Sequence, residues 1–407
     1  MTGPLVGYRV LDLSRILAGP WAAQLLSDLG AEVWKVERPG TGDDTRGWGP
    51  PYLKDADSND TTESAYFLSA NRGKHSICID IATEEGAAIV RALAQQADVV
   101  IENYKCGDMA RYGLDYAALR ELKPDIIYCS ITGYGQTGPM KDVAGYDMAI
   151  QAIGGLMSIT GESDDLPGGG PQKVGVPIVD ILTGVYSSTA IISALLHRER
   201  TGEGQHIDMA LLDVIVSVLA NQNLNFLTTG VPPGRSGNAH PNIVPYQVFK
   251  TSDGAFVLAV GNDQQFRKFC SVIGLTGIAD DPRFLTNTDR LHNRKELIPL
   301  LEVPLRKEST EFWISVLEPI GVPCAPINRL DQVFAHPQVI HRGLQISLPH
   351  TVGAMAPLVG NPIKFSKTKI EYKKTPPLIG EDTDYILEDV LNFDKEYIRK
   401  LRQNGVV

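Results

Sequence analysis

Residues 8–37, YRVLDLSRILAGPWAAQLLSDLGAEVWKVE, contain a complete β-α-β pattern near the start of the chain. In Tyr8 to Leu13, apolar and polar residues alternate and branched residues are frequent, which predicts a strand. Gly19-Pro20 then opens a helix with proline in its first turn, and Gly30 follows the expected end of that helix. Glu32 to Glu37 has the pattern of a second strand. Two strands joined through a helix by short connections predict a parallel sheet.

The same alternation continues beyond this unit. We expect three further strands, at Ser76 to Ile81, Val99 to Asn103 and Ile126 to Thr132. Between them we expect a helix at Glu84 to Gln96 and a second helix that ends at Leu119 to Leu122. Strands that alternate with helices are typical of an α/β domain with a Rossmann-like parallel sheet.

The second half of the chain has a different pattern. Val185 to Leu196 and Ile207 to Phe226 are apolar enough to predict buried helices. Gln247 to Thr251 and Ala255 to Val260 are two short strands joined across Asp253-Gly254, which predicts a hairpin. Helical stretches at 264–273 and 293–318 complete a smaller α+β unit, and a strand-like run at 363–372 and a helical pair at 383–403 form the tail.

Composition and charge exclude several classes of protein. The chain has 407 residues, 43% hydrophobic and 21% charged, which is ordinary globular composition. Its net charge of −10 argues against non-specific nucleic-acid binding. The N-terminus shows no signal or transit segment, and the longest apolar runs look too short and interrupted to span a bilayer. We expect a soluble, cytoplasmic protein without membrane partners.

The spacing of the cysteines and histidines indicates neither a disulfide framework nor a metal centre. The five cysteines are widely spaced without C-x-x-C, which indicates free thiols in a reducing compartment. The histidines show no metal-ligand spacing. The adjacent carboxylates Asp43-Asp44 and Asp164-Asp165 are interpreted as solvated loops, so no metal site is expected.

The first β-α turn does not support a dinucleotide site. Residues 14–20 lack the G-x-G-x-x-G pattern that lets the backbone approach a pyrophosphate. Three cations instead follow predicted strand ends: Arg38, Lys105 and, slightly later, Arg111. Taken together they suggest a phosphorylated ligand at the sheet edge, although each alone is also compatible with a solvated surface charge.

One carboxylate has two interpretations. Asp180 lies in KVGVPIVDILTGVY, residues 173–186, with apolar neighbours on both sides and a glycine-rich loop before it. Asp is a favoured helix N-cap and a helical segment follows, so a capping role is one reading. A nucleophilic carboxylate is the other. Backbone N–H groups at a helix start are expected to lower the pKa of Asp180 and keep it ionised.

The chain resembles the family III CoA-transferases, the CaiB/BaiF or formyl-CoA-transferase-like group. The matching motifs occur in family order over nearly the whole chain: VLDL (10–13), AGP (18–20), LGAEV (29–33), KVERPG (35–40), GDDTR (42–46), ENY (102–104), GYG (133–135), GYD (145–147), TGEGQ (201–205) and PLIGE (377–381). Within the family, ITGYGQTGP (131–139), VPYQ (244–247) and HNRKEL (292–297) are similar to the glutarate-type transferases, which use succinyl-CoA as donor.

The resemblance implies a role for each site residue. Asp180 takes the position of the catalytic aspartate, which carries first an acyl group and then CoA. Coenzyme A enters as a thioester substrate, and no permanently bound cofactor is expected. The CoA-binding positions are Leu17, Ala18, Arg38, Ile79, Asn103, Tyr104, Lys105, Arg111 and Tyr146. Trp48, Tyr66, Gly237 and Asn238 are expected near the acyl group, and we add Arg46 as a candidate for the distal carboxylate of a dicarboxylic acid.

Two departures from the family pattern narrow the activity. Position 17 is Leu where oxalate-type members carry Gln, which favours a larger, partly apolar acid. Position 146 is Tyr where the acyl-CoA racemases of the superfamily carry His, and racemisation needs an acid/base pair. We expect CoA transfer from a donor such as succinyl-CoA to a dicarboxylate such as glutarate. An α-methylacyl-CoA racemase and a non-catalytic CoA-binding protein remain the alternatives.

The resemblance also implies the domain organisation. A large α/β domain is expected from residues 1–224 and 331–407, with a small α+β domain at 225–330. Two chains are expected to form an interlocked homodimer.

Overall fold

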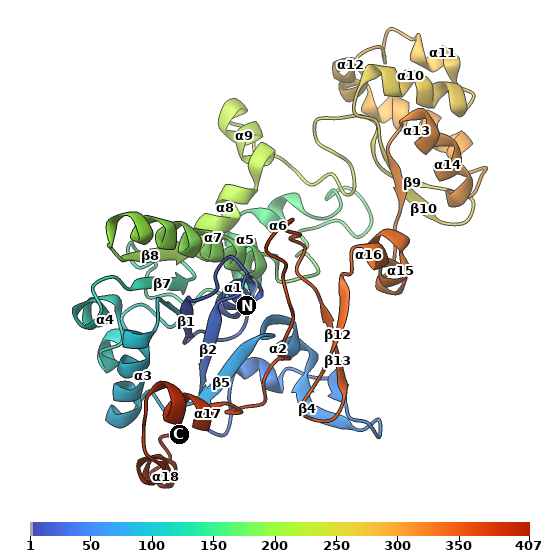
Figure 1. The fold of residues 1–407 in the computed structure, drawn as a ribbon. Helices are drawn as coiled ribbons and strands as arrows, with labels where there is room; N and C mark the ends of the chain where they lie inside the picture. The colour runs from blue at the N-terminus through green and yellow to red at the C-terminus, as the bar shows by residue number, and fades with distance from the viewer. Residues whose placement is uncertain (1–2) are drawn as a thin grey trace. The chain divides into compact units, whose positions relative to one another are not determined.

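The chain folds into two compact units. The computed structural model describes residues 3–407. The first unit comprises the chain up to Leu156, Val174–Leu224 and Gln338–Val407, and the second comprises Met157–Lys173 and Asn225–Pro337 (Figure 1). This division differs from the expected one in two respects. The glycine-rich segment 157–173 belongs with the second unit, and the chain returns to the first unit at residue 338 and not at residue 331.

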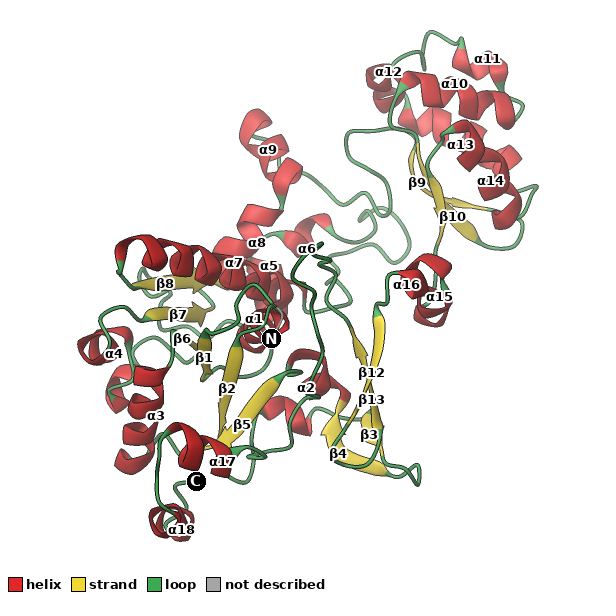
Figure 2. Ribbon diagram, viewed as in Figure 1, coloured by secondary structure: helices red, strands yellow, loops and turns green. Residues whose placement is uncertain are grey.

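A six-stranded parallel sheet forms the centre of the first unit (Figure 2). Its strands are β1 (Arg9–Asp12), β2 (Glu32–Glu37), β5 (Lys74–Cys78), β6 (Val99–Glu102), β7 (Ile127–Thr132) and β8 (Gln205–Ala210), in the spatial order β5-β2-β1-β6-β7-β8. The strand order reverses between β1 and β6, which is the point where open α/β sheets bind ligands. The predicted Rossmann-like sheet is thus confirmed. The sixth strand was not predicted, because residues 207–210 were expected to be helical.

Successive apolar side chains of each strand point to opposite faces of the sheet, so both faces are apolar and both are covered by helices. Leu11 and Trp34 point to the face that packs against α3 (Glu84–Gln96), α4 (Tyr116–Leu122) and α18 (Lys395–Gln403). Val10 and Val33 point to the opposite face, where α1 (Ala18–Asp28), α5 (Asp147–Ile153), α7 (Ile178–Thr201) and α8 (Leu211–Val218) lie.

Helix α7 packs closely along α1. A Cβ added at Gly184 would lie 2.8 Å from the carbonyl oxygen of Ala18 and 2.9 Å from Cβ of Trp21, so glycine permits this approach. With 24 residues, α7 is longer than expected, and by length and hydropathy alone it meets the criteria for a membrane span. Its packing on α1 and the sheet accounts for its apolar character as a core helix. The predicted burial of this segment holds for only part of its surface, because Ile191 and Leu195 are buried whereas Val185 and Leu196 are exposed.

Smaller elements complete the first unit. The strand pair β3 (Tyr52–Lys54) and β4 (Asp60–Ser64) precedes α2 (Ala65–Ala70), and the hairpin β12 (Gln345–Pro349) and β13 (Met355–Val359) lies in the C-terminal part. The strand expected at 363–372 is absent from the described tail, where that stretch is irregular. The tail ends with α17 (Thr383–Tyr385), a π-helical turn at Ile386–Val390 and α18.

The second unit has its own core. The strands β9 (Tyr246–Lys250), β10 (Ala255–Ala259) and β11 (Cys324–Pro326) form an antiparallel sheet, and the hairpin predicted across Asp253-Gly254 is confirmed. Phe249, Phe256 and Trp313 are among its buried side chains. Its helices are α10 (Asp263–Val272), α11 (Thr276–Ala279), α12 (Asn287–His292), α13 (Arg294–Leu305), α14 (Thr310–Leu317) and α15 (Leu330–Ala335), while α6 (Leu156–Ile159), α9 (Ala220–Thr229) and α16 (Pro337–His341) contain its boundaries.

Candidate active site

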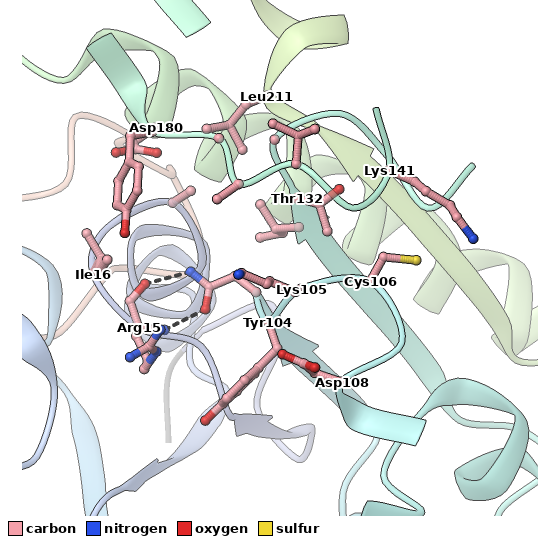
Figure 3. A pocket seen from close by; sticks show the side chains of 18 of the residues that line it. Arg15, Ile16, Tyr104, Lys105, Cys106, Asp108, Thr132, Lys141, Asp180 and Leu211 are labelled. Carbon is pink, nitrogen blue, oxygen red and sulfur yellow. Dashed lines mark hydrogen bonds between the residues drawn. The ribbon is translucent and has the colours of Figure 1, made fainter. Parts of the chain in front are cut away.

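A pocket of about 460 Å³ opens at the carboxyl ends of β1, β6 and β7 in the first unit (Figure 3). It lies at the position where the strand order reverses. Its lining contains Asp180 and four cationic side chains, with apolar and small residues between them: Arg15, Ile16, Leu17, Ala18, Asn103, Tyr104, Lys105, Cys106, Asp108, Arg111, Ile131, Thr132, Gly133, Lys141, Val143, Ala144, Gly145, Tyr146, Asp180 and Leu211.

Asp180 faces this pocket from the first turn of α7. It is not the N-cap, because that position is Pro177 and the helix has no side-chain cap of its own. Asp147 serves instead: its Oδ2 accepts from the backbone N–H of Val179 at 2.8 Å and from that of Asp180 at 3.4 Å. The capping interpretation of Asp180 was therefore wrong.

The pKa of Asp180 moves in the direction opposite to the one expected. Burial raises the pKa from 3.8 to about 7, and the negative charge of Asp147 adds to the increase. Backbone N–H groups were expected to lower it, but their available hydrogen bonds go to Asp147. Near neutral pH, Asp180 is therefore divided between its protonated form and the carboxylate.

The first β-α turn is held in a strained shape beside the pocket. Ile16 has φ = 70°, a left-handed conformation that is rare for a β-branched residue. Asn103 accepts from Arg15 N at 2.8 Å and donates to Arg15 O at 2.7 Å (Figure 3). The Asp43 carboxylate accepts from Ile16 N at 3.3 Å. Gly19 allows the turn to close, because a Cβ there would lie 2.2 Å from Ser14 Oγ.

Two buried ion pairs lie next to this turn, and one of them also contacts its backbone. Lys35 donates to Asp43 at 2.8 Å and to the carbonyl of Ser14 at 3.0 Å. Lys74 pairs with Asp12 at 2.8 Å, and all four charged side chains are buried. Burial alone would raise the pKa of Asp43, but the charge and hydrogen bond of Lys35 together with the Thr45 donors lower it to about 2. Asp43 is consequently ionised when it accepts from the strained turn.

The predicted CoA-binding residues are distributed over two neighbouring pockets. Most of them line the larger one: Leu17, Ala18, Asn103, Tyr104, Lys105, Arg111 and Tyr146. Arg38 and Ile79 line a smaller pocket that shares Arg15 and Tyr104 with the first. Both polar atoms of the Asn103 side chain are hydrogen-bonded to the backbone of Arg15, so Asn103 stabilises the β1–α1 turn.

Arg46 does not have the surroundings predicted for a substrate ligand. Its guanidinium donates to both oxygens of Glu37 at 2.8 Å, to Glu63 at 3.1 Å and to the carbonyl of Pro377 at 2.9 Å. It also lies 3.6 Å from the centroid of the Phe67 ring. Because the side chain is buried and its donors are almost all used, these contacts indicate a structural role in place of the predicted one.

The remaining predicted substrate residues fall in two places. The rings of Trp48 and Tyr66 meet edge to face at 5.0 Å. Burial, together with the charges of Asp180 and Asp147, raises the pKa of Tyr66 to about 12, so its phenol is close to those carboxylates. Gly237 and Asn238 belong to the second unit, where the N–H of Gly237 donates to the carbonyl of Gly161 at 3.0 Å.

Sequence reasoning missed several pocket residues. Arg15 and Lys141 are cations that line the pocket. Arg15 lies three residues after the end of β1, just as Lys105 lies three residues after the end of β6, so the signal that singled out Lys105 could have found Arg15. Asp147, which does not itself line the pocket, belongs to the GYD motif at 145–147, and no role was predicted for it. Among residues 3–407 no cluster of three or more His, Cys, Asp or Glu side chains has the arrangement of a metal site.

A parallel sheet covered by helices on both faces, with a cationic pocket at the point where the strand order reverses, places the chain among the open, doubly wound α/β proteins. A model of CoA-transferase family III matches residues 5–383. The chain is 50% identical over 392 residues to the succinate–glutarate CoA-transferase of Agrobacterium fabrum, covering 96% of this chain and 97% of that protein. It is 46% identical over 405 residues to the succinyl-CoA:glutarate CoA-transferase of Mus musculus, covering 99% and 90%.

A solved structure agrees with these matches. The crystal structure of a CaiB/BaiF family protein from Brucella suis superposes with a TM-score of 0.84 at 48% identity, covering 96% of this chain and 100% of that one. The chain belongs to family III of the CoA-transferases, which confirms the family and the enzyme class predicted from its motifs.

Proposed function

We propose that this enzyme transfers CoA from succinyl-CoA to glutarate or a closely similar dicarboxylate, with Asp180 as the carrier. The observation that carries the proposal is the position of Asp180 in a cationic pocket at the switch point of the sheet. The relatives at 50% and 46% identity are a succinate–glutarate and a succinyl-CoA:glutarate CoA-transferase, and they support this choice of donor and acceptor.

The reaction needs only carboxylates and a thioester. The Asp180 carboxylate attacks the succinyl carbonyl, the C–S bond breaks, and CoA leaves as a thiolate from a succinyl–aspartyl anhydride. The thiolate then attacks the aspartyl carbonyl, which releases succinate and forms an aspartyl–CoA thioester. Glutarate displaces CoA from this thioester to form a second anhydride. Attack of the thiolate on the glutaryl carbonyl yields glutaryl-CoA and restores the Asp180 carboxylate.

The pocket residues suit these steps. Arg15, Lys105, Arg111 and Lys141 place positive charge around the cavity in a protein of net charge −10, and CoA carries phosphates. Burial of Asp180 leaves its carboxylate poorly solvated, which favours attack over hydrolysis by bulk water.

An acceptor panel tests this function directly. Succinyl-CoA is incubated with glutarate, adipate, malonate, oxalate or butyrate, and the CoA esters are measured by mass spectrometry. We expect glutaryl-CoA to form fastest. Dominant oxalyl-CoA would contradict the proposed acceptor. Loss of deuterium from the α-carbon of a 2-methylacyl-CoA without acid exchange would support the racemase alternative.

We also propose that two chains associate as a homodimer. Val185 and Tyr186 on α7, Leu196 near its end and Val216 on α8 are 41–52% exposed, and apolar exposure of this kind marks interfaces. Light scattering should give twice the 44.3 kDa of one chain at micromolar concentration. A mass of one chain under those conditions would rule the dimer out.

A further inference from the structure

Two side chains on α5 hold the segment that leads into Asp180. Asp147 accepts from the N–H of Val179 at 2.8 Å with one oxygen, and its other oxygen accepts from Gln151 Nε2 at 2.5 Å. Gln151 is fully buried, and its Oε1 accepts from the N–H of Val174 at 2.9 Å. The chain is therefore held at 174 and again at 179–180, on both sides of Pro177.

This contact replaces a local cap. The first N–H groups of a helix have no partner within the helix, and Pro177 has no side-chain acceptor to offer them. Asp147, 33 residues earlier in the chain, supplies the acceptor through space. The direction of the first turn of α7, and with it the direction of the Asp180 side chain, then depends on α5.

The two carboxylates have opposite surroundings. Asp147 accepts hydrogen bonds from the Gln151 side chain and from the backbone N–H groups of Val179 and Asp180. In the described chain no hydrogen-bond donor contacts the carboxylate of Asp180, which is buried and feels the negative charge of Asp147. Paired acids with divergent surroundings commonly have different roles in one site.

We propose that Asp147, held by Gln151, is a positioning residue for Asp180: it fixes the first turn of α7 and places a second negative charge beside the acyl-carrying carboxylate. This inference rests on the proposed role of Asp180 and adds the part of the protein that orients it. Asp147 itself forms no bond with substrate.

The other charged groups around Asp180 come from several elements. Tyr66 of α2 is close enough to respond to its charge, and Asp147 is on α5. The pocket cations come from the β1–α1 turn, from the segment after β6 and from the loop before α5, namely Arg15, Lys105, Arg111 and Lys141. Removing Asp147 leaves these groups in place, so a change in the ionisation of Asp180 reports on Asp147.

The variants separate position from charge. Asp147→Asn keeps one oxygen for the N–H of Val179, removes the charge, and turns an amide donor toward Gln151. The double variant Asp147→Asn/Gln151→Glu restores both contacts, because the carboxylate introduced at position 151 would accept from the new amide and from the N–H of Val174. It also moves the negative charge one helical turn away. Asp213→Asn, at an exposed position on α8, is the control for net charge.

The first readout is the pH dependence of kcat/KM for succinyl-CoA. In the native enzyme kcat/KM should rise with pH with a midpoint near the pKa of about 7 of Asp180, because the carboxylate form reacts. Asp147→Asn should move the midpoint down by about one pH unit, since a like charge is gone. Asp213→Asn should leave it unchanged.

The second readout is the split between kcat and KM. Asp147→Asn should lower kcat by about tenfold with KM for succinyl-CoA changed by no more than about twofold, and the double variant should recover most of that loss. A structural role alone would not give recovery of kcat together with a lowered midpoint. Circular dichroism of each variant verifies that it folds.

The outcomes distinguish this inference from the proposed function. If the native enzyme forms a covalent CoA adduct on Asp180 and both variants keep its midpoint and kcat, the positioning role is overturned and the function stands. If the native enzyme forms no adduct and transfers no CoA, the proposed function fails. An adduct in the native enzyme, a lowered midpoint in Asp147→Asn and in the double variant, and recovery of kcat in the double variant would support both the proposed function and the positioning role. A loss of kcat that the double variant does not recover would overturn the positioning role.

Discussion

Replacing Asp180 with asparagine is expected to abolish CoA transfer. The amide has nearly the same shape but is not a nucleophile, so neither the proposed anhydride nor the proposed aspartyl–CoA thioester could form. Loss of a nucleophile that forms the covalent intermediate typically lowers kcat by about four orders of magnitude or more. The measurement is turnover of succinyl-CoA with glutarate, together with the mass of the protein after exposure to succinyl-CoA alone.

The same substitution should make the folded chain more stable above neutral pH. The folded pKa of Asp180, about 7, lies above the unfolded value of 3.8, so the folded state loses stability as pH rises from 4 to 7. That loss is complete above pH 7 and amounts to at most about 4 kcal/mol. Asparagine carries no such charge, so the melting temperature of Asp180→Asn should exceed that of the native chain at pH 8, with a smaller difference at pH 5.

Controls for Asp180 are available on the same unit. Asp213→Asn makes the same chemical change at an exposed position and should keep native turnover. Asp180→Ala should also be inactive, and it should still bind CoA if the pocket is intact. Native-like turnover in either Asp180 variant would refute the covalent mechanism. An inactive variant with no gain in stability at pH 8 would contradict the assignment of a raised pKa.

Replacing Lys35 with methionine is expected to destabilise the protein by about 3–5 kcal/mol, because breaking a buried ion pair leaves one charge without compensation. Lys35 is fully buried and is 2.8 Å from Asp43. Its charge and hydrogen bond help hold the pKa of Asp43 at about 2, against the effect of burial. Without Lys35 that pKa should rise, so the loss of stability should be greater at pH 8 than at pH 4. Urea unfolding at the two pH values measures this difference.

The Lys35 variant should also impair binding of the thioester. Lys35 donates to the carbonyl of Ser14, and its partner Asp43 accepts from the N–H of the strained Ile16 beside the pocket. KM for succinyl-CoA should therefore rise in the folded fraction. Lys54→Met is the control, because the Lys54–Asp60 pair is exposed and such pairs contribute at most about 1 kcal/mol. If Lys35→Met and Lys54→Met lowered the free energy of unfolding equally, burial of the Lys35–Asp43 pair would not explain the loss of stability.

The parallel sheet was predictable because its strands carry a strong pattern. Branched residues at 8–13 and 32–37, with glycine and proline at the turns, predicted β1 and β2 within two residues of their observed bounds. The sixth strand was missed because its alternation, Gln205–Ala210, runs directly into the apolar helix Leu211–Val218. Averaged over both elements, that stretch resembles one helix.

For the site, the sequence predicted which residues are present better than it predicted their contacts. The residue types in the pocket were predicted through motifs, and Asp180, Lys105 and Tyr146 do line one cavity. Arg46 was assigned to substrate on its chemistry alone. Its partners Glu37, Glu63 and Pro377 lie 9, 17 and 331 residues away, so their convergence on one guanidinium follows only from the fold.

The linear pattern of residues was enough to specify a parallel α/β sheet, the strand ends that border the pocket, and the carboxylate at the start of α7. These features depend on neighbours along the chain. The protonation of Asp180 was decided by the tertiary structure alone. A pKa depends on burial and on charges within a few ångströms, and here both are produced by α5 and the sheet folding around α7.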